Sequence, residues 1–263
     1  MLTLMRNRLP PLLCELHAHT TWSDGDLSVR ELVDLYGGRG FDVLCVTDHT
    51  LRTDDPWLEP QDRDTFGVRR DVHAAYVSDV LREAGRAHAM YGLLVIPGTE
   101  LTYNADCPEA SAHAVAVGLT RFASVDDGLD GALETARAAG AAIIAAHPFD
   151  DEPWPDPTRR TRRFAIDPKL RRLVHRFELF NRETLFGWVA REGLPFVASG
   201  DFHQPTHLGG WKTLLPCEKD PDAVVAYLRS ARPAYVTRVD DALPHGLTGT
   251  LFAAEHRRTA SAA

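Results

Sequence analysis

The sequence has few cysteines and no long hydrophobic run. Its four cysteines lie far apart and form no C-x-x-C pair, so a thiolate zinc site or a redox pair is not expected. No segment approaches the run of roughly 18 apolar residues that a membrane span requires, and the N-terminus shows no signal-peptide pattern. We therefore expect a cytoplasmic protein without a membrane partner.

The sequence also lacks an excess of basic residues and a glycine-rich phosphate loop. Lys and Arg number 29 against 37 Asp and Glu, a formal net charge of −8, which excludes a global basic footprint for nucleic acid. Neither G-x-G-x-x-G nor G-x-x-x-x-G-K-[ST] occurs, which argues against a nucleotide-binding sheet. By contrast, the chain has 12 histidines. With 263 residues and 44% hydrophobic content, we expect a single domain over 1–263, with a polar tail at about 255–263.

Short apolar runs alternate with segments of helical period along the whole chain. Apolar strands that alternate with helices predict a parallel sheet covered on both faces, and seven such units fit a closed α/β barrel better than an open sheet. The expected strands are 12–16, 42–47, 93–96, 113–117, 141–145, 176–180 and 195–198, with a last short one near Tyr235, and the expected helices are 29–38, 71–91, 129–139, 183–192 and 222–230.

Polar residues gather where these strands end. In a parallel barrel the carboxyl ends of the strands meet on one face, where barrel enzymes place their chemistry. His113 is the exception, because it starts its strand and reaches that face only if the strand is short or reversed. Imidazole with carboxylate suits zinc, iron or manganese, and nine ligands are enough for two or three ions. The candidates are His17, His19, Asp24, His49, Glu100, His113, His147, Asp201 and His203.

Other polar residues have more than one candidate role. Asp48 either orients His49 or caps a helix, and Glu178 and Asn181 are either substrate contacts or satisfied polar groups at a strand end. His207 is expected not to bind metal, and a general-acid role requires it to lie within hydrogen-bond reach of substrate. Ordinary core or surface positions are expected for His73, His88, His175, His245 and His256.

The motifs resemble those of the PHP superfamily, named after polymerase and histidinol phosphatase. The resemblance runs in order over nearly the whole chain and implies a distorted (β/α)7 TIM-like barrel with a trinuclear metal site. The segments that carry it are Glu15-Leu16-His17-Ala18-His19-Thr20 with Ser23-Asp24-Gly25, Val46-Thr47-Asp48-His49, Pro97-Gly98-Thr99-Glu100, His113, Ala146-His147-Pro148, Glu178-Leu179-Phe180-Asn181 and Ser199-Gly200-Asp201-Phe202-His203.

The resemblance also implies which residues share an ion. One ion would be bound by His17, His19, Glu100 and Asp201, and Glu100 would bridge to a second ion. The second ion would also be bound by His113 and His147, and the third by Asp24, His49 and His203. Because all nine positions are filled, we expect an active enzyme with three divalent ions (Zn, Mn or Fe), in which Asp201, His203 and His49 are catalytic.

The function that the resemblance implies is hydrolysis of phosphate esters, as a phosphatase or a phosphodiesterase/exonuclease, by a metal-activated hydroxide. The substrate would be a phosphorylated small molecule, a nucleotide or an oligonucleotide end, phosphate would be released, and no obligate protein partner is evident. Arginine forks suit phosphate oxygens, and the predicted substrate contacts are Arg52, Asn181, Arg182 and Lys212.

Two alternatives and one ambiguous segment remain open. An amidohydrolase-type C–N hydrolase also uses H-x-H in a barrel, although no lysine lies at a strand end to bridge two metals after carboxylation. A non-catalytic metal-binding module is the other alternative. The basic run from Arg159 to Arg176 is either a solvated face or a patch that attracts a polyanionic substrate.

Overall fold

The computed structural model describes residues 10–63, 65–150 and 161–240, together with the two-residue strand β12 (Phe252–Ala253). The predicted polar tail at 255–263 lies outside the described residues. His256 belongs to this tail, and Arg159, Arg160 and His245 also lie outside the described residues.

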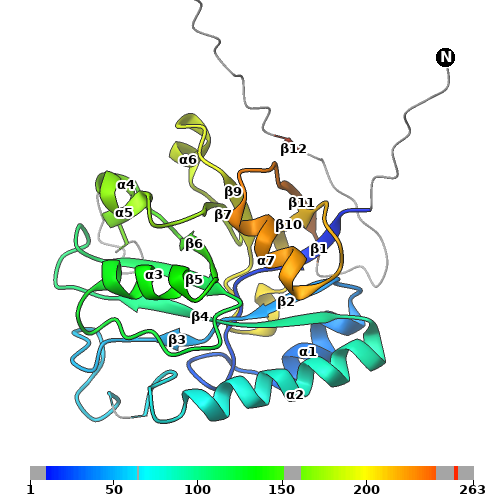
Figure 1. Cartoon of the computed structure of the whole chain (residues 1–263), viewed down its shortest axis with the longest axis horizontal. Coiled ribbons are helices and arrows are strands. Elements are labelled where there is room, and N and C mark those ends of the chain that lie inside the picture. The colour runs from blue at the N-terminus through cyan, green and yellow to red at the C-terminus, as the bar shows by residue number, and fades with distance from the viewer. Residues whose placement is uncertain (1–9, 64, 151–160, 241–251, 254–263) are drawn as a thin grey trace, which may run out of the picture.

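The strands form one curved sheet (Figure 1). Its main path runs β12-β11-β10-β1-β2-β4-β5-β6-β7-β8, and β3 and β9 pair with β4 and β7 respectively. The strand bounds are β1 Leu12–Glu15, β2 Val43–Val46, β3 His49–Thr50, β4 Leu94–Tyr103, β5 Ala112–Val117, β6 Ala142–Ala146, β7 Arg176–Asn181, β8 Thr184–Leu185, β9 Phe196–Ser199, β10 Gly210–Leu215 and β11 Tyr235–Val239.

The curved sheet closes on itself where the chain beyond β9 meets the chain beyond β1. Ala18 and Phe202 form a parallel bridge, in which His19 N donates to Phe202 O at 2.8 Å and Phe202 N donates to His17 O at 3.1 Å. We call this junction the seam. The predicted α/β fold with a distorted barrel is thereby confirmed.

A side chain of β10 links this strand to β9, close to the seam. The hydroxyl of Thr213 accepts from Ala198 N at 2.8 Å and donates to Ala198 O at 2.7 Å. The hydroxyl of one threonine therefore satisfies the backbone N–H and C=O of Ala198, which backbone groups of a paired strand would otherwise satisfy.

The strand directions differ from the parallel arrangement that we expected. β5 runs antiparallel to both β4 and β6, and β10, which the sequence did not predict, runs antiparallel to β1 and β11. β10 escaped prediction because Lys212 and Thr213 interrupt its apolar pattern although both are buried. The predicted helix 183–192 shortens to α6 (Gly187–Arg191), because β8 forms a hairpin with the end of β7.

The longer helices cover the sheet from outside (Figure 1). α1 (Val29–Gly38) and α2 (His73–Tyr91) pack against β2 and β4, and α3 (Leu129–Ala138) packs against β5 and β6. Ser28 starts α1 with a reciprocal capping box to Glu31. No helix in the described part of the chain is both long and apolar enough to cross a bilayer.

α7 (Pro221–Arg229) lies against the barrel interior and is held there by a buried arginine. Its residues Val224, Tyr227 and Leu228 pack with inward-facing residues of the strands. The guanidinium of Arg176, at the start of β7, donates to backbone carbonyls at the end of α7, including Leu228 O at 3.0 Å. Burial lowers the pKa of Arg176 to about 10. Because Arg176 lies at the amino end of its strand, α7 closes the end of the barrel opposite to the carboxyl strand ends.

Half of the six basic residues in the described part of the run that ends at Arg176, residues 161–176, form ion pairs. In the short helices α4 (Arg163–Ile166) and α5 (Pro168–Arg171) and just before them, three arginines pair with acids from other segments. The pairs are Arg162–Glu109, Arg163–Asp130 and Arg171–Glu192. Within residues 161–176 the run therefore fits an ion-paired surface better than a free polyanion site.

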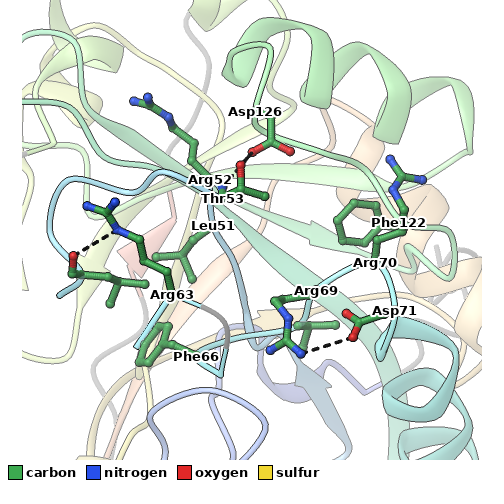
Figure 2. Close-up of a pocket in the computed structure, with 12 residues that line it drawn as sticks. Leu51, Arg52, Thr53, Arg63, Phe66, Arg69, Arg70, Asp71, Phe122 and Asp126 are labelled. Carbon is green, nitrogen blue, oxygen red and sulfur yellow. Dashed lines mark hydrogen bonds and ion pairs between the residues drawn. The ribbon is translucent and has the colours of Figure 1, made fainter. Parts of the chain in front are cut away.

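The long segment between β3 and α2 lines a cavity of about 480 Å³ beside the carboxyl end of the sheet. Figure 2 shows arginine side chains from this segment around the cavity, with Phe66 and Phe122 among them.

Candidate metal centre

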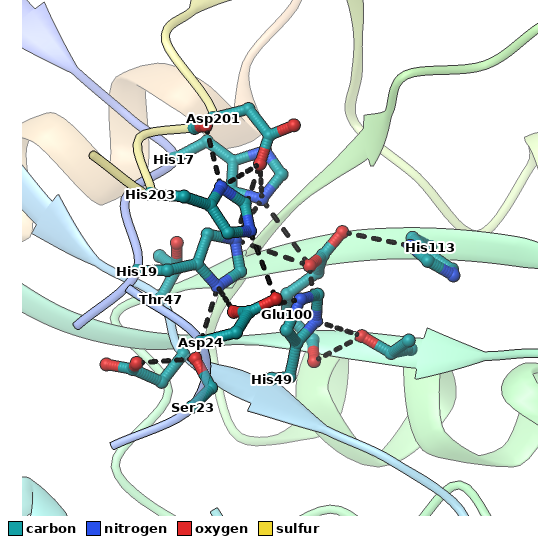
Figure 3. A network of polar contacts seen from close by, with 12 residues as sticks. His17, His19, Ser23, Asp24, Thr47, His49, Glu100, His113, Asp201 and His203 are labelled. Carbon is teal, nitrogen blue, oxygen red and sulfur yellow. Dashed lines mark hydrogen bonds and ion pairs between the residues drawn. The ribbon is translucent and has the colours of Figure 1, made fainter. Parts of the chain in front are cut away.

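The structure brings all nine predicted metal ligands together at the carboxyl ends of the strands. Their ligand atoms form three groups, within each of which the atoms lie within 4.8 Å of one another. Figure 3 shows most of these side chains pointing toward Glu100 at the middle of the cluster. The groups are His19-Asp24-His49-His203, His17-His19-Asp201 and Glu100-His113-His147.

The fold explains how residues so far apart in sequence converge. His17 and His19 follow β1, His147 follows β6, and Asp201 follows β9. His113 reaches the same face because β5 is reversed, which places His113 opposite Ala146 at the end of β6. Of the two possibilities that the position of His113 left open, a short strand or a reversed one, the structure therefore has the reversed strand.

The central group lies deepest. The Nε2 atoms of His17 and His19 are 3.0 Å apart, and each lies 3.5 Å from Asp201 Oδ1 and 3.5 Å from Glu100 Oε2. Two imidazole nitrogens that face each other beside two carboxylates surround a point suited to one cation. The donor set therefore fits a divalent ion.

The outer groups lie on either side of the central group. Asp24 links the first outer group, with carboxylate oxygens 3.5 Å from His49 Nε2 and 3.4 Å from His203 Nε2. Glu100 links the second, with Oε1 3.2 Å from His147 Nε2 and 3.3 Å from His113 Nδ1. His113 Nδ1 and Glu100 Oε2 are buried and lack a hydrogen bond of regular geometry to the described residues. Such atoms are ordinarily satisfied, so a bound cation fits them.

Electrostatics point the same way. Burial opposes ionisation of Glu100, but His49 and His17 outweigh it and hold the pKa of Glu100 well below its usual value. Burial opposes protonation of His17, yet Asp201 and Glu100 hold the pKa of His17 well above its usual value. Burial lowers the pKa of His19 to about 3, with help from His49 and His203. The centre therefore combines ionised carboxylates with a demand for positive charge, as a cation site does.

Four histidines have a polar partner at the second ring nitrogen. His17 Nδ1 contacts Glu178 Oε1 at 2.9 Å. His49 Nδ1 lies 2.7 Å from Thr102 Oγ1 and also 2.7 Å from Glu100 Oε2. The other two contacts are His113 Nε2–Asn104 Oδ1 at 2.8 Å and His147 Nδ1–Thr161 Oγ1 at 3.2 Å. Such partners fix the tautomer and direction of a ligating imidazole.

Glu178 and Asn181 belong to this supporting network. Besides contacting His17, Glu178 accepts from His147 N at 2.7 Å and from Asn181 Nδ2 at 2.9 Å. Asn181 is only 6% exposed. Asn181 therefore holds the network together from a position that leaves it little access to substrate.

Asp48 fixes the loop that carries Asp24. Its carboxylate accepts from Thr20 N and Thr20 Oγ1, both at 2.8 Å, and from Ser23 Oγ at 2.7 Å. The sequence suggested that Asp48 orients His49 or caps a helix. In the structure its carboxylate instead binds Thr20 and Ser23.

A buried ion pair under the seam was missed from the sequence. Glu15 Oε1 accepts from His17 N at 3.2 Å and from Gly200 N at 2.8 Å, and Glu15 Oε2 lies 2.7 Å from Lys212 Nζ. A Cβ atom on Gly200 would overlap both charged groups. The pair thus fixes the backbone next to two predicted ligands, His17 and Asp201.

The four predicted substrate contacts have different surroundings. Lys212 is fully buried in the pair with Glu15. Arg52 forms an ion pair with Asp54 at 2.8 Å. The guanidinium of Arg182 is 39% exposed and donates to Asp201 O at 2.7 Å, so it lies at the mouth of the centre.

His207 is a poor general acid. Its Nδ1 accepts from His203 N at 3.1 Å, and burial together with Arg182 lowers its pKa to about 4. It is therefore neutral near pH 7. Among the other histidines expected to be ordinary, His73 packs beside Phe122, and His175 accepts from Ile143 N.

Backbone strain concentrates at the centre. In the described ranges, three non-glycine residues have positive φ angles: His147 at 28°, Arg182 at 52° and Asp201 at 44°. This region is costly for residues with a Cβ and is retained where the surrounding structure enforces it, frequently at functional sites.

Comparison with known proteins supports the fold. No family model matches the chain, and no curated protein matches it. A two-domain protein from Bacteroides vulgatus, containing a predicted PHP-like metal-dependent phosphoesterase, aligns over 88% of this chain with 21% identity and a TM-score of 0.63; the chain spans 65% of that protein's length.

An amidohydrolase from Chromobacterium violaceum, with bound sulfate and no metal, aligns over 86% of this chain and 97% of its own, with 17% identity and a TM-score of 0.51. Both similarities concern the fold. The chain has the distorted barrel fold of the PHP-like phosphoesterases whose motifs its sequence resembles.

Proposed function

We propose that the protein is a metal-dependent phosphoesterase with three divalent ions in a single domain. The observation that carries this proposal is the convergence of nine histidine and carboxylate ligands into three adjoining groups. The matched Bacteroides protein contains a predicted PHP-like metal-dependent phosphoesterase, which agrees with this chemistry.

The proposed ions would supply a hydroxide nucleophile near neutral pH and would neutralise phosphate oxygens. The residues of the chain would bind these ions and bury them from solvent. His17, Glu100 and Asp201 lie in the interior of the centre. Glu100 belongs to the second outer group, with Oε1 3.2 Å from His147 Nε2, and its Oε2 lies 3.5 Å from His17 Nε2 of the central group. Glu100 could therefore contribute a ligand atom to both neighbouring sites.

Arg182 is the residue best placed to bind the phosphate of the substrate. Its guanidinium lies 3.3 Å from Asp201 Oδ2 and 3.4 Å from His203 Nδ1, and it is more exposed than those two side chains. An arginine fork can bind two phosphate oxygens at once. We therefore assign substrate binding to Arg182 before Arg52.

The test is loss of activity in His49→Ala and Asp201→Ala. Each variant should lose phosphatase activity by about 100- to 1,000-fold or more, because the loss of preorganised groups at the reacting centre costs that much. Activity would be measured after metal reconstitution on a panel of phosphomonoesters, nucleotides and short oligonucleotides. Elemental analysis would report bound metal, with fewer ions expected in both variants.

His88→Ala is the matched control, because His88 is exposed on α2 and lies in none of the three groups. It should retain both activity and metal. Full activity in either His49→Ala or Asp201→Ala would contradict the proposal.

A C–N hydrolase is the second candidate, and the similarity to the Chromobacterium amidohydrolase favours keeping it in the test. Against it, Lys212 is paired with Glu15 under the seam and does not bridge two ligand groups. Turnover of amides or cyclic amides, with no turnover of phosphate esters, would select this second function.

A further inference from the structure

The cavity of about 480 Å³ beside the β3–α2 segment is large enough for a small organic ligand. None of the nine predicted metal ligands lines it. Its walls come from the segment between β3 and α2 and from Phe122 and Asp126, on the chain between β5 and α3.

Two residues of the cavity wall connect it to the metal centre. The ring of Phe66 stacks against that of His49, with centroids 6.0 Å apart. Arg52 donates to Asn104 O at 3.1 Å, and the side chain of Asn104 contacts His113 Nε2. A molecule in the cavity would therefore lie one side chain, Phe66, away from the group that contains His49, and two residues, Arg52 and Asn104, away from the group that contains His113.

The cavity carries excess positive charge. Its wall holds four arginines against two carboxylates, Asp71 and Asp126. Arg52 pairs with Asp54 and Arg69 with Asp71, and Asp126 accepts from Thr53 N at 2.7 Å. Arg63 instead donates to Leu58 O at 3.3 Å. Arg70 lies over the ring of Phe122 at 4.7 Å. In the described part of the chain, neither Arg63 nor Arg70 forms an ion pair with a carboxylate.

The remaining walls are apolar and partly aromatic. Leu51, Phe66, Val68 and Phe122 line the same cavity as the four arginines. Figure 2 shows Phe66 and Phe122 on its walls. Phenylalanine faces and arginine planes both favour a flat ring between them, and the unpaired guanidinium groups favour a negative substituent on that ring.

We propose that this cavity binds the leaving group of the substrate, and that this leaving group is an aromatic ring with a negatively charged substituent. The inference rests on the proposed phosphoesterase activity. In the reaction, the oxygen of water bonds to phosphorus and the P–O bond to the aryl group breaks with its electron pair. The aryl oxygen takes up a proton, so the products are phosphate and a hydroxyaryl acid.

The first experiment compares two substrates of the metal-loaded protein, 4-carboxyphenyl phosphate and glycerol 2-phosphate. The wild type should prefer the aryl ester in kcat/KM. In Arg63→Gln and in Phe122→Leu, the ratio of the two kcat/KM values should fall about tenfold, mainly through the KM of the aryl ester. Arg82→Gln is the control, because Arg82 is exposed on α2, and it should leave the ratio unchanged.

The second experiment measures binding without turnover. Isothermal titration of benzene-1,3-dicarboxylate into chelator-treated protein should show binding that Arg63→Gln weakens about tenfold and Arg82→Gln does not. Binding that depends on Arg63, in a protein that hydrolyses no phosphate ester, would overturn the proposed function but retain the anion-binding cavity. Phosphatase activity with no aryl preference, and no such binding, would overturn this inference alone.

Discussion

At the scale of single residues, the pair formed by Glu15 and Lys212 links the core to the metal centre. Glu15 binds backbone amides on both sides of the seam, and Lys212 neutralises its charge. Both side chains are fully buried. Removing one partner of such a pair leaves an unpaired buried charge, which costs about 3–5 kcal/mol.

We therefore predict that Lys212→Met lowers the free energy of unfolding by about 3–5 kcal/mol and weakens metal binding, because the amides of His17 and Gly200 lose a fixed acceptor. Denaturant unfolding and metal titration would measure the two effects. The double variant Glu15→Gln/Lys212→Met should recover much of the stability, since neither charge then remains. Equal losses in the single and double variants would show that the charge is not the cause.

The nine candidate ligands were identifiable from sequence because histidine and carboxylate at strand ends form recognisable ordered motifs. Their supporting partners were not, because Thr102, Asn104 and Thr161 are common residue types at positions without a distinctive pattern. Lys212 was misplaced for a related reason. A lysine normally indicates surface, and nothing local to it reveals that Glu15 lies across the seam.

At the scale of elements, the main departure from prediction is strand direction. The apolar pattern of a buried strand does not depend on whether the strand runs parallel or antiparallel to its neighbours. The pattern therefore located β5 but did not give its orientation. The position of His113 narrowed the choice to a short or a reversed strand, and the structure shows that the strand is reversed. β10 was not predicted because two buried polar residues interrupt its apolar pattern. Each of them is buried only because a residue distant in sequence is its partner, which the local pattern does not reveal.

The hydroxyl of Thr213 in β10 is the side-chain link to Ala198 in β9. Thr213→Val should lower the free energy of unfolding by about 2–3 kcal/mol, because the N–H and C=O of buried Ala198 both lose their partner. Thermal or urea unfolding would measure it. Thr237→Val is the control, since Thr237 is also buried in neighbouring β11 and its hydroxyl forms no hydrogen bond to the described residues. Equal stability in the Thr213 variant and wild type would refute this role.

At the scale of the whole molecule, the proposed metal sites would couple metal binding to the stability of the barrel. The three ligand groups draw on segments from β1 to β9, and the ionised carboxylates of Glu100 and Asp201 lie inside the barrel. A ligand that binds only the folded state stabilises it, by about 2.7 kcal/mol at a hundred times its dissociation constant.

Removal of metal by a chelator should therefore lower Tm by about 5–10 °C, given about 2–4 °C per kcal/mol for a chain of this size. Scanning fluorimetry before and after chelation, with elemental analysis of both samples, would measure this. Hydrogen exchange should accelerate at the amides of His19 and Phe202 in the seam, more than at Val115 in β5. An unchanged Tm after verified loss of metal would contradict the coupling.

The position of the seam has a consequence for how this cysteine-poor chain limits its own unfolding. Glu15 and Gly200 are 185 residues apart in sequence, yet the proposed central ion would be shared by their neighbours His17 and Asp201. Such an ion would act as a reversible cross-link that encircles most of the polypeptide, a constraint that secreted proteins obtain from disulfides. The concentration of available metal would then determine the resistance of the fold to unfolding as well as the activity.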